Sequence, residues 1–282
     1  MRTIKVRIIA SVVLCAVLSA LVCGGISIQN SRESSYVNSQ EYMLLSTQNK
    51  SMEMDHMMKR VEQSVENVYS VALEQLDDLG QFKTSKAYVD SYTNEMEGIL
   101  REFAQNTDGA LTAYIRYNPE FTEPTSGLFL TRDSSEGEFT SVAPTDFSMY
   151  DPGDLEHVGW YYIPVNNKKP TWMEPYLNSN INVYMVSYVI PIYIGGESIG
   201  IIGMDIDFRS FTDVLSATSL FDTGYAFLAN ADGNIMYHKE LEVGTQLRDA
   251  DSGLSVAADA IADEGKAGTC LSYSYQGQEK KM

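Results

Sequence analysis

The sequence predicts an α+β fold, in which antiparallel sheets pack against helices behind a membrane-spanning helix. An uncharged run of 21 residues, 8–28, lies near the amino terminus. Residues 41–79 contain neither Gly nor Pro and repeat apolar side chains at helical spacing. Two strand-like runs, 184–194 and 198–206, are joined around Gly195-Gly196, a pair that permits the positive φ values of a tight hairpin turn.

Composition and charge limit the class of protein. The chain has 282 residues, which is enough for two small domains. Its 38 acidic and 20 basic residues give a net charge of −18, which argues against a nucleic-acid partner because phosphate binding needs a basic face. The three cysteines, Cys15, Cys23 and Cys270, are too few for a disulfide framework and do not have the spacing of a zinc ribbon.

The amino-terminal segment predicts the location. The charges before the apolar run are all basic, and a helix over 8–28 would span about 31 Å, the thickness of a bilayer core. Because positive charge stays on the cytoplasmic side, residues 1–7 form a cytoplasmic tip and residues 29–282 are extracytoplasmic, anchored in the cell membrane by a single pass. The alternatives are a cleaved signal peptide, whose apolar region is usually about 7–15 residues, and a lipoprotein site at Cys23, which would need a small residue in place of Val22.

A long helix is expected to follow the membrane segment. Apolar residues recur at spacings of three and four from Met54 to Leu79, as in a heptad stripe, and Gly80 supplies a stop. We assign residues 29–82 to a stalk helix. Membrane-proximal heptads commonly pair, so we expect a homodimer through this helix; the alternative is that the stripe packs only against its own domain.

The rest of the chain is expected to form two versions of one small sheet module, 83–211 and 212–282, of which the second is incomplete. The expected segments are a helix at 84–107, strands at 111–117 and 127–131, a long polar loop, the hairpin strands, a helix at 211–220, and strands at 224–230 and 235–238. This order predicts an antiparallel sheet with helices on one side.

Four motifs then carry a resemblance: Val158–Tyr162, Trp172–Tyr176, Ser187–Pro191 and the glycine-rich Gly195–Asp207. In this order and spacing the chain resembles the double Cache (dCache_1) family, the extracytoplasmic sensor domains of bacterial transmembrane receptors, which place tandem PAS-like modules after an anchor and a stalk helix. The resemblance implies that the membrane-distal module binds a small molecule and that the membrane-proximal module transmits the signal. It also implies a second transmembrane helix and a cytoplasmic output domain, which would lie beyond residue 282.

The last strand of the hairpin carries the candidate ligand contact. Side chains alternate along a strand, so Ile201, Gly203, Asp205 and Asp207 share one face. Gly203 is expected to leave that face open beside Asp205, where a ligand could approach closely. A carboxylate there needs a cation or hydrogen-bond donors, and aromatic side chains are natural companions of an ammonium group.

The resemblance refines the choice of ligand and residues. In amino-acid-binding members an arginine two positions before the Trp-Tyr pair holds the ligand carboxylate, but Val158 stands there in this chain, and Asn178 stands where a partner acid is expected. Asp205 and Tyr176 keep their places, which favours an amine or other small organic cation over a standard α-amino acid. Arg116 is the nearby strand cation that could replace the carboxylate clamp. The candidate ligand-binding residues are Asp205, Trp160, Tyr161, Tyr176, Trp172, Asn178, Tyr184, Ser187, Tyr114 and Arg116.

Each of these residues also suits a structural role, because aromatic residues beside a sheet are often core and an aspartate can cap a turn. No enzyme motif competes with the binding site: His56, His157 and His238 lie in separate segments, and the sequence has no HExxH, GxSxG or P-loop pattern. Asp205 and Asp207, about 7 Å apart on one strand face, could act as an acid–base pair or bind calcium, but no second cluster supports this. We expect no catalytic residue, metal or cofactor.

The sequence therefore predicts the ligand-sensing region of a transmembrane signal-transduction receptor of the chemoreceptor, histidine kinase or diguanylate cyclase type. A membrane-anchored solute-binding protein without an output domain is the alternative, and a dimeric stalk whose modules bind another protein is a third interpretation. The expected partners are a small-molecule ligand, the lipid bilayer and a second copy of the chain, without nucleic acid.

Overall fold

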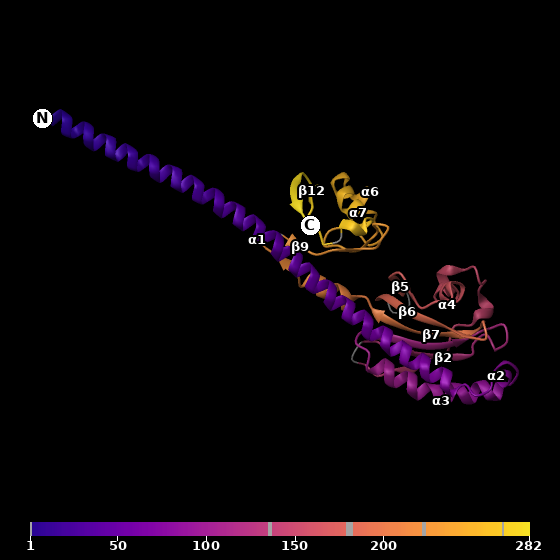
Figure 1. Ribbon diagram of the computed structural model, residues 1–282. Coiled ribbons are helices and arrows are strands. Elements are labelled where there is room, and N and C mark those ends of the chain that lie inside the picture. Colours follow the sequence, from indigo (N-terminus) through magenta and orange to yellow (C-terminus); the bar gives the residue numbers. More distant parts are fainter. Residues whose placement is uncertain (1, 135–136, 179–182, 222–223, 267) are drawn as a thin grey trace. The chain divides into compact units, whose positions relative to one another are not determined.

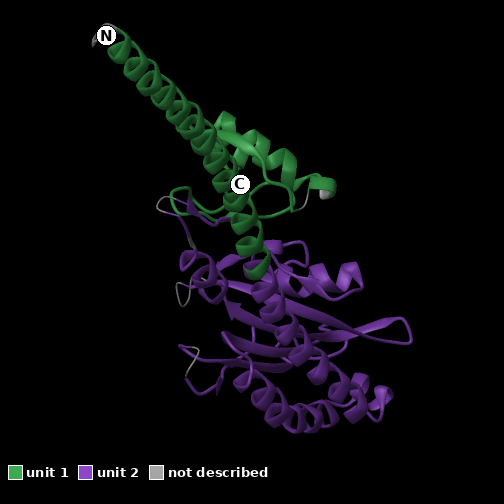
Figure 2. Cartoon of the chain, turned by 60° about the vertical axis from the view of Figure 1, so that its left-hand side comes forward, with its two compact units in different colours: residues 1–49, 228–282 green, residues 50–227 purple. Residues whose placement is uncertain are grey.

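The computed structural model describes residues 2–134, 137–178, 183–221, 224–266 and 268–282. They form two compact units, 50–227 and 1–49 with 228–282, which Figure 2 shows in purple and green. The α-helices are α1 (Arg2–Gln75), α2 (Leu79–Thr84), α3 (Lys86–Gln105), α4 (Leu155–Asn167), α5 (Arg209–Ser216), α6 (Leu247–Ala250) and α7 (Ser255–Ile261), with 3-10 turns at Phe147–Met149, Ser252–Leu254 and Glu264–Lys266. The strands are β1 (Ala110–Tyr117), β2 (Gly127–Thr131), β3 (Thr140–Ser141), β4 (Thr171–Trp172), β5 (Tyr176–Asn178), β6 (Val183–Ile194), β7 (Glu197–Asp207), β8 (Ser219–Leu220), β9 (Gly224–Tyr225), β10 (Leu228–Ala229), β11 (Ile235–Tyr237), β12 (Ser272–Tyr275) and β13 (Gln278–Lys281).

Helix α1 contains the apolar run that the sequence assigned to the membrane. Among the described residues it is the one helix long and apolar enough to cross a bilayer, and none of its most apolar window is buried. An unburied apolar surface of this length is what a bilayer-spanning segment requires. Further along, its apolar stripe is buried in the 50–227 unit at Val61, Val65, Val68 and Ala72.

The end of α1 differs from the expectation. The helix ends at Gln75, before Gly80, and the short helix α2 begins at Leu79. Asp78 explains the break, because its side chain accepts a hydrogen bond from the Gln81 N–H at 2.9 Å and so caps α2. A capping aspartate therefore ends the long helix, and Gly80 lies inside the next one.

Seven strands of the 50–227 unit form one antiparallel sheet in the order β3-β2-β1-β7-β6-β4, with β5 also paired to β6. β6 and β7 are the hairpin that the sequence predicts, and Gly195 and Gly196 take φ values of 61° and 88° in its turn. β1 lies between β2 and β7, with Thr112 opposite Asp205 and Tyr114 opposite Gly203. The candidate carboxylate therefore lies in the middle of the sheet.

Helices cover both faces of this sheet, and the expectation of helices on one side only was wrong. Figure 1 shows α4 on one side of β6 and β7 and α3 on the other. All eight residues of β1 are buried, as a strand covered on both faces must be. The sequence analysis did not predict α4, because this helix contains Gly159 and Pro164, two poor helix formers.

The second unit has small sheets of its own. The hairpins β10–β11 and β12–β13 lie with α6 and α7 in the 1–49 and 228–282 unit, whose buried residues include Ile235, Leu247 and Leu254. The strand expected at 224–230 is present only as the two-residue strands β9 and β10. The helix expected at 211–220 is α5, which ends at Ser216.

Candidate ligand-binding site

Asp205 lies on β7 at the centre of a buried hydroxyl cluster. Only 3% of its surface is exposed. The Thr112 hydroxyl donates a short hydrogen bond to Oδ2 of Asp205, and the Tyr114 hydroxyl donates to Oδ1 at 3.2 Å. Both donors are on β1, where the antiparallel register places them on the face of Asp205. The strand pairing itself therefore assembles this cluster.

Asp205 is a buried acidic group that no cationic side chain among the described residues neutralises. Burial raises the pKa of Asp205, and the nearby hydroxyls of Thr112, Ser187 and Tyr114 offset only part of this effect. Among the residues that the structure describes, no lysine, arginine or histidine forms an ion pair with Asp205. By contrast, Asp207 on the same strand forms an ion pair with Arg209, with 2.7 Å between Oδ2 of Asp207 and Nη2 of Arg209.

The space above Gly203 is filled by the protein, so the expectation of an open face at this glycine was wrong. A Cβ atom added at Gly203 would lie 2.5 Å from Cε2 of Tyr114. The glycine therefore makes room for the Tyr114 ring, whose hydroxyl reaches Asp205. The role of Gly203 is to admit a side chain from the neighbouring strand, and not to leave a vacant approach.

Aromatic rings from three segments close over this face. The ring of Tyr114 stacks on that of Phe129, with 5.4 Å between the ring centroids. Trp160 of α4 meets the Tyr114 ring edge-on, with 5.2 Å between the centroids. Phe147 packs against Tyr161, which follows Trp160 in α4, with 4.7 Å between the ring centroids. Together with Val158, Val189 and Ile201 these residues form one apolar cluster. In this structure the aromatic side chains pack directly against one another over the face of the sheet that carries Asp205, so the site is closed.

Arg116 lies on the same face of β1 and is fully buried. Its guanidinium stacks on Phe147, with Cζ 4.3 Å from the ring centroid, and donates to the backbone carbonyls of Pro124, Ser126 and Thr145. Burial lowers the pKa of Arg116 to about 10, which leaves it protonated at neutral pH.

Ser187 and Tyr176 also lie near Asp205. Ser187 is opposite Asp205 in the β6–β7 register, and its buried Oγ has no hydrogen-bond partner in the described geometry. Tyr176 is 37% exposed as a residue, yet burial of its hydroxyl and the nearby charge of Asp205 raise its pKa. These two side chains, together with Thr112 and Tyr114, supply hydroxyl groups around one carboxylate.

Trp172 and Tyr184 do not join the cluster. The Trp172 indole N–H donates to Glu62 of α1 at 2.8 Å, and its ring lies 5.0 Å from Tyr188. Side chains alternate on β6, so Tyr184 and Tyr188 face away from the side of the sheet that carries Ser187 and Asp205. The sequence could not assign the face of Trp172, because its short strand pairs with the sheet only through tertiary contacts. The side chain of Asn178 lies outside the described residues.

Thr112 and Phe147 are site residues that the sequence analysis missed. Thr112 could have been found, because it is two residues before Tyr114 on the same strand face. Phe147 lies in a 3-10 turn, Phe147–Met149, within the polar loop, and no periodicity marks it. Only the folding of that loop over the sheet brings Phe147 to Arg116.

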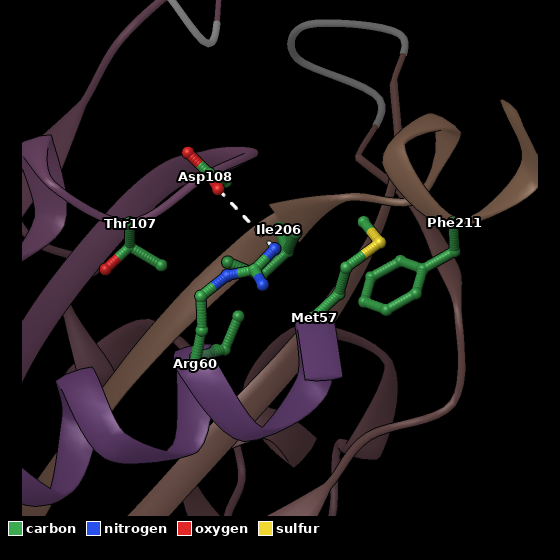
Figure 3. Close-up of a pocket in the computed structure, with 7 residues that line it drawn as sticks. Met57, Arg60, Thr107, Asp108, Ile206 and Phe211 are labelled. Carbon is green, nitrogen blue, oxygen red and sulfur yellow. Dashed lines mark ion pairs between the residues drawn. The ribbon is translucent and has the colours of Figure 1, made fainter. Parts of the chain in front are cut away.

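The two cavities described in this unit lie elsewhere. One, of about 10 Å³, is next to the ion pair between Arg60 and Asp108, 3.5 Å apart, as Figure 3 shows. The other is an open groove of about 620 Å³, whose lining includes Tyr69 of α1, Lys168 and Lys169. No group of three or more His, Cys, Asp or Glu side chains suited to a metal ion occurs in the described part of the chain.

A helix suited to a membrane, followed by a sheet with a buried carboxylate under an aromatic cover, is typical of an extracytoplasmic ligand-sensing domain. Comparison with known proteins identifies the family: the Cache domain model dCache_1 matches residues 31–282, and the chain belongs to this family. The fold is that of the sensory domain of the Campylobacter jejuni chemoreceptor Tlp3, with a TM-score of 0.59 and 17% identity over 88% of this chain and 87% of that one.

Two further proteins are similar to this chain. The ligand-binding domain of the Pseudomonas aeruginosa amino acid chemoreceptor PctC in complex with GABA has a TM-score of 0.54 and 16% identity, covering 86% of this chain and 90% of that chain. The methyl-accepting chemotaxis protein PctB of Pseudomonas aeruginosa is 26% identical over 114 residues, 40% of this chain and 18% of that protein. The matches to curated relatives span only 16 to 23% of their length.

Proposed function

We propose that residues 29–282 are the extracytoplasmic sensing region of a transmembrane signal-transduction receptor and that Asp205 binds the cationic group of a small organic ligand, an amine in particular. The observation that carries the ligand class is the state of Asp205, a carboxylate 3% exposed, with hydroxyl donors but no ion pair to a described cationic side chain. In the proposal the membrane-distal module is 83–211 and the membrane-proximal module is 212–282.

The chemistry of the site favours an ammonium group. Burying an ion costs several kcal/mol even after relaxation, and the hydroxyls of Thr112 and Tyr114 bring hydrogen bonds but no positive charge. A ligand ammonium supplies both the charge and the donors. The faces of Trp160 and Tyr114 add attraction for a cation, worth about 0.5 to 2 kcal/mol per ring.

The closed packing of the site gives the proposal a mechanism. Trp160 contacts both Tyr114 and Phe147, so a ligand that reaches Asp205 replaces some of these ring contacts. The ligand then stabilises an arrangement in which α4 is displaced from the sheet, and the closed form dominates without it. A ligand shifts such an equilibrium by its difference in affinity for the two forms. In this proposal the shift passes to the membrane through the stalk helix, 29–82, in a homodimer.

Isothermal titration calorimetry on the full chain in detergent micelles tests the ligand class. We expect binding of primary or quaternary amines and a loss of about 100-fold or more in affinity for Asp205→Asn, as for removing one partner of a buried charge pair. Asp207→Asn is the matched control, because this strand carboxylate already pairs with Arg209. Tight binding of standard α-amino acids with no binding of amines would contradict the proposal.

The receptor half of the proposal has a separate test. Sequencing the gene beyond codon 282 should reveal an apolar run of about 20 residues followed by a cytoplasmic domain of the chemoreceptor, histidine kinase or diguanylate cyclase type. A stop codon directly after codon 282 would instead support the membrane-anchored solute-binding protein.

A further inference from the structure

The open groove of about 620 Å³ lies at the edge of the seven-stranded sheet, and Asp205 is not part of its lining. β4 pairs with β6 only at Tyr188 and Val189, so from Ile190 onward β6 has no described strand on its outer side. The groove is lined by this uncovered stretch of β6, which includes Ile190 and Tyr193. Its volume is within the range of small-molecule sites, about 300–1,000 Å³.

Three segments of the 50–227 unit form the walls of the groove. Helix α1 contributes Tyr69, strand β6 contributes Tyr193, and the loop after α4 contributes Lys168 and Lys169. The Tyr193 hydroxyl donates to the carbonyl of Val165, in the last turn of α4, at 2.7 Å. The Lys168 N–H donates to the same carbonyl at 3.2 Å. These two hydrogen bonds fix the lysine-bearing loop to the edge strand, so the groove needs little rearrangement to accept a ligand.

Lys168 and Lys169 differ from the other cations of this unit. Each of the other surface cations among the described residues of 50–227 forms an ion pair with an Asp or Glu; these are Lys50, Lys59, Arg60, Lys83, Lys86, Arg101 and Arg209. Arg116 and Arg132 are buried and donate to backbone carbonyls. No described acidic side chain forms an ion pair with Lys168 or Lys169. In a chain of net charge −18 these two adjacent cations suit an anionic ligand.

Lys168 also takes a backbone conformation that is unusual for a lysine. It is the C-cap of α4 with a φ of 54°, a left-handed conformation that usually belongs to Gly or Asn. A residue with a Cβ atom in this conformation costs about 1–2 kcal/mol. The chain therefore has a lysine at the border of the groove, where glycine would be less strained.

The lining of the groove indicates the class of ligand. Glu66 also lines it, so the two lysines and this carboxylate together give one net positive charge, which suits a molecule with one negative charge. The rings of Tyr69 and Tyr193 and the side chain of Ile190 form an apolar wall. An aromatic ligand gains about 0.5–1.5 kcal/mol from each ring pair beyond the area that it buries. Pro191 has no N–H to offer on this stretch of β6, which disfavours the addition of a peptide strand.

We propose that this groove is a second ligand site, which binds an aromatic monocarboxylate. The carboxylate of the ligand lies on Lys168 and Lys169, and its ring packs against Tyr69 and Tyr193. This site has no residue in common with the amine site at Asp205, so the inference goes beyond the proposed function and does not depend on it.

Matched ligands test the inference on the unaltered protein. Calorimetry on the full chain in micelles compares benzoate, phenylacetate and indole-3-acetate with the amide of each acid. We expect at least one of these acids to bind tenfold or more tightly than its amide, because hydrogen bonds between charged groups are the stronger ones. Its affinity should fall between about 0.05 and 0.5 M NaCl, since salt screens exposed charges. Equal affinities of acid and amide, or no binding of any of the three acids, would overturn the inference.

Variants then locate the bound acid. Lys168→Gln combined with Lys169→Gln should abolish the tenfold preference for the acid over its amide. Lys50→Gln combined with Lys59→Gln is the matched control, because it changes the net charge equally at two lysines of α1 that already form ion pairs. Lys168→Arg combined with Lys169→Arg should keep the preference, which separates the charge of these residues from a structural role at the end of α4. Asp205→Asn should leave the affinity for the acid within about threefold.

Other outcomes would assign the binding differently. Binding of the acid that is lost in Asp205→Asn but kept in the double lysine variant would place the ligand at the first site and overturn the inference. Lysine-dependent binding of a polyglutamate peptide, without binding of the aromatic acids, would overturn it in favour of an acidic segment of a partner protein. If the aromatic acids bind and amines do not, the proposed amine site fails and the present inference stands.

Discussion

The ring of Tyr114 lies across the backbone of Gly203, and the two residues are directly opposite each other on β1 and β7. This arrangement brings the Tyr114 hydroxyl to Asp205 at 3.2 Å. The absence of a side chain at position 203 therefore determines where the donor for the buried carboxylate lies. A residue that contacts no ligand can in this way control the geometry of the site.

Replacing Gly203 with alanine tests this relationship. The new Cβ would lie 2.5 Å from the Tyr114 ring, so the ring must move away from Asp205. Overpacking of this kind costs about 1–3 kcal/mol, and we expect a lower melting temperature together with weaker ligand binding. Gly98→Ala is the control: Gly98 lies in α3 with open space around it, and alanine there should stabilise the helix by about 0.5–1 kcal/mol.

The pH dependence of stability reports the charge of Asp205. Burial raises its pKa above the usual 3.8, so the folded protein holds this proton at a pH where the unfolded chain has lost it. The ionised carboxylate thus destabilises the folded state above the raised pKa, and the penalty fades as the pH falls through that pKa toward 3.8. Without ligand, Asp205→Asn should be more stable than the wild type at about pH 7, with a difference that shrinks toward about pH 4.

Thermal unfolding of the two proteins over this pH range checks that prediction. Asp207→Asn serves as a comparison, because Asp207 forms an ion pair with Arg209 and its removal should destabilise the protein at neutral pH. A stability difference between wild type and Asp205→Asn that does not change with pH would show that the pKa of Asp205 is the same in the folded and the unfolded protein.

Trp172 should affect stability but not binding. Its indole donates to Glu62 of α1, on the opposite side of the sheet from Asp205. Trp172→Phe removes this hydrogen bond, and we expect a loss of about 1–2 kcal/mol in the free energy of unfolding with an unchanged ligand affinity. Calorimetry and chemical denaturation give the two quantities. A tenfold or greater loss of affinity would mean that the α1 side of the sheet takes part in recognition.

Trp160 should report ligand binding directly. The chain has two tryptophans, so Trp172→Phe leaves Trp160 as the single indole emitter. Because Trp160 packs between Tyr114 and Phe147, displacement of its ring by a ligand should change the intensity and wavelength of its fluorescence. The complementary variant Trp160→Phe, which keeps only Trp172, should show little change. A ligand that binds without altering the Trp160 fluorescence would contradict the proposed displacement of α4 from the sheet.

The sequence by itself determined the apolar helix suited to a membrane, the hairpin and the family. The uncharged run 8–28, the alternating strands around Gly195-Gly196 and the order of the aromatic and glycine motifs are local signals. Local backbone preference and hydrophobic period are enough to predict such elements. Asp205 could be selected in the same way, because its position on the strand follows from alternation.

The tertiary structure alone decided what surrounds Asp205. Phe147 and α4 fold over the sheet from a segment with no clear hydrophobic period, and they close the face that Gly203 was expected to leave open. The same folding places Trp172 on the other side and leaves Arg116 with an unsatisfied nitrogen. These features depend on contacts between residues far apart in the chain, whose free energy is set by packing and desolvation and leaves no pattern in the neighbouring sequence.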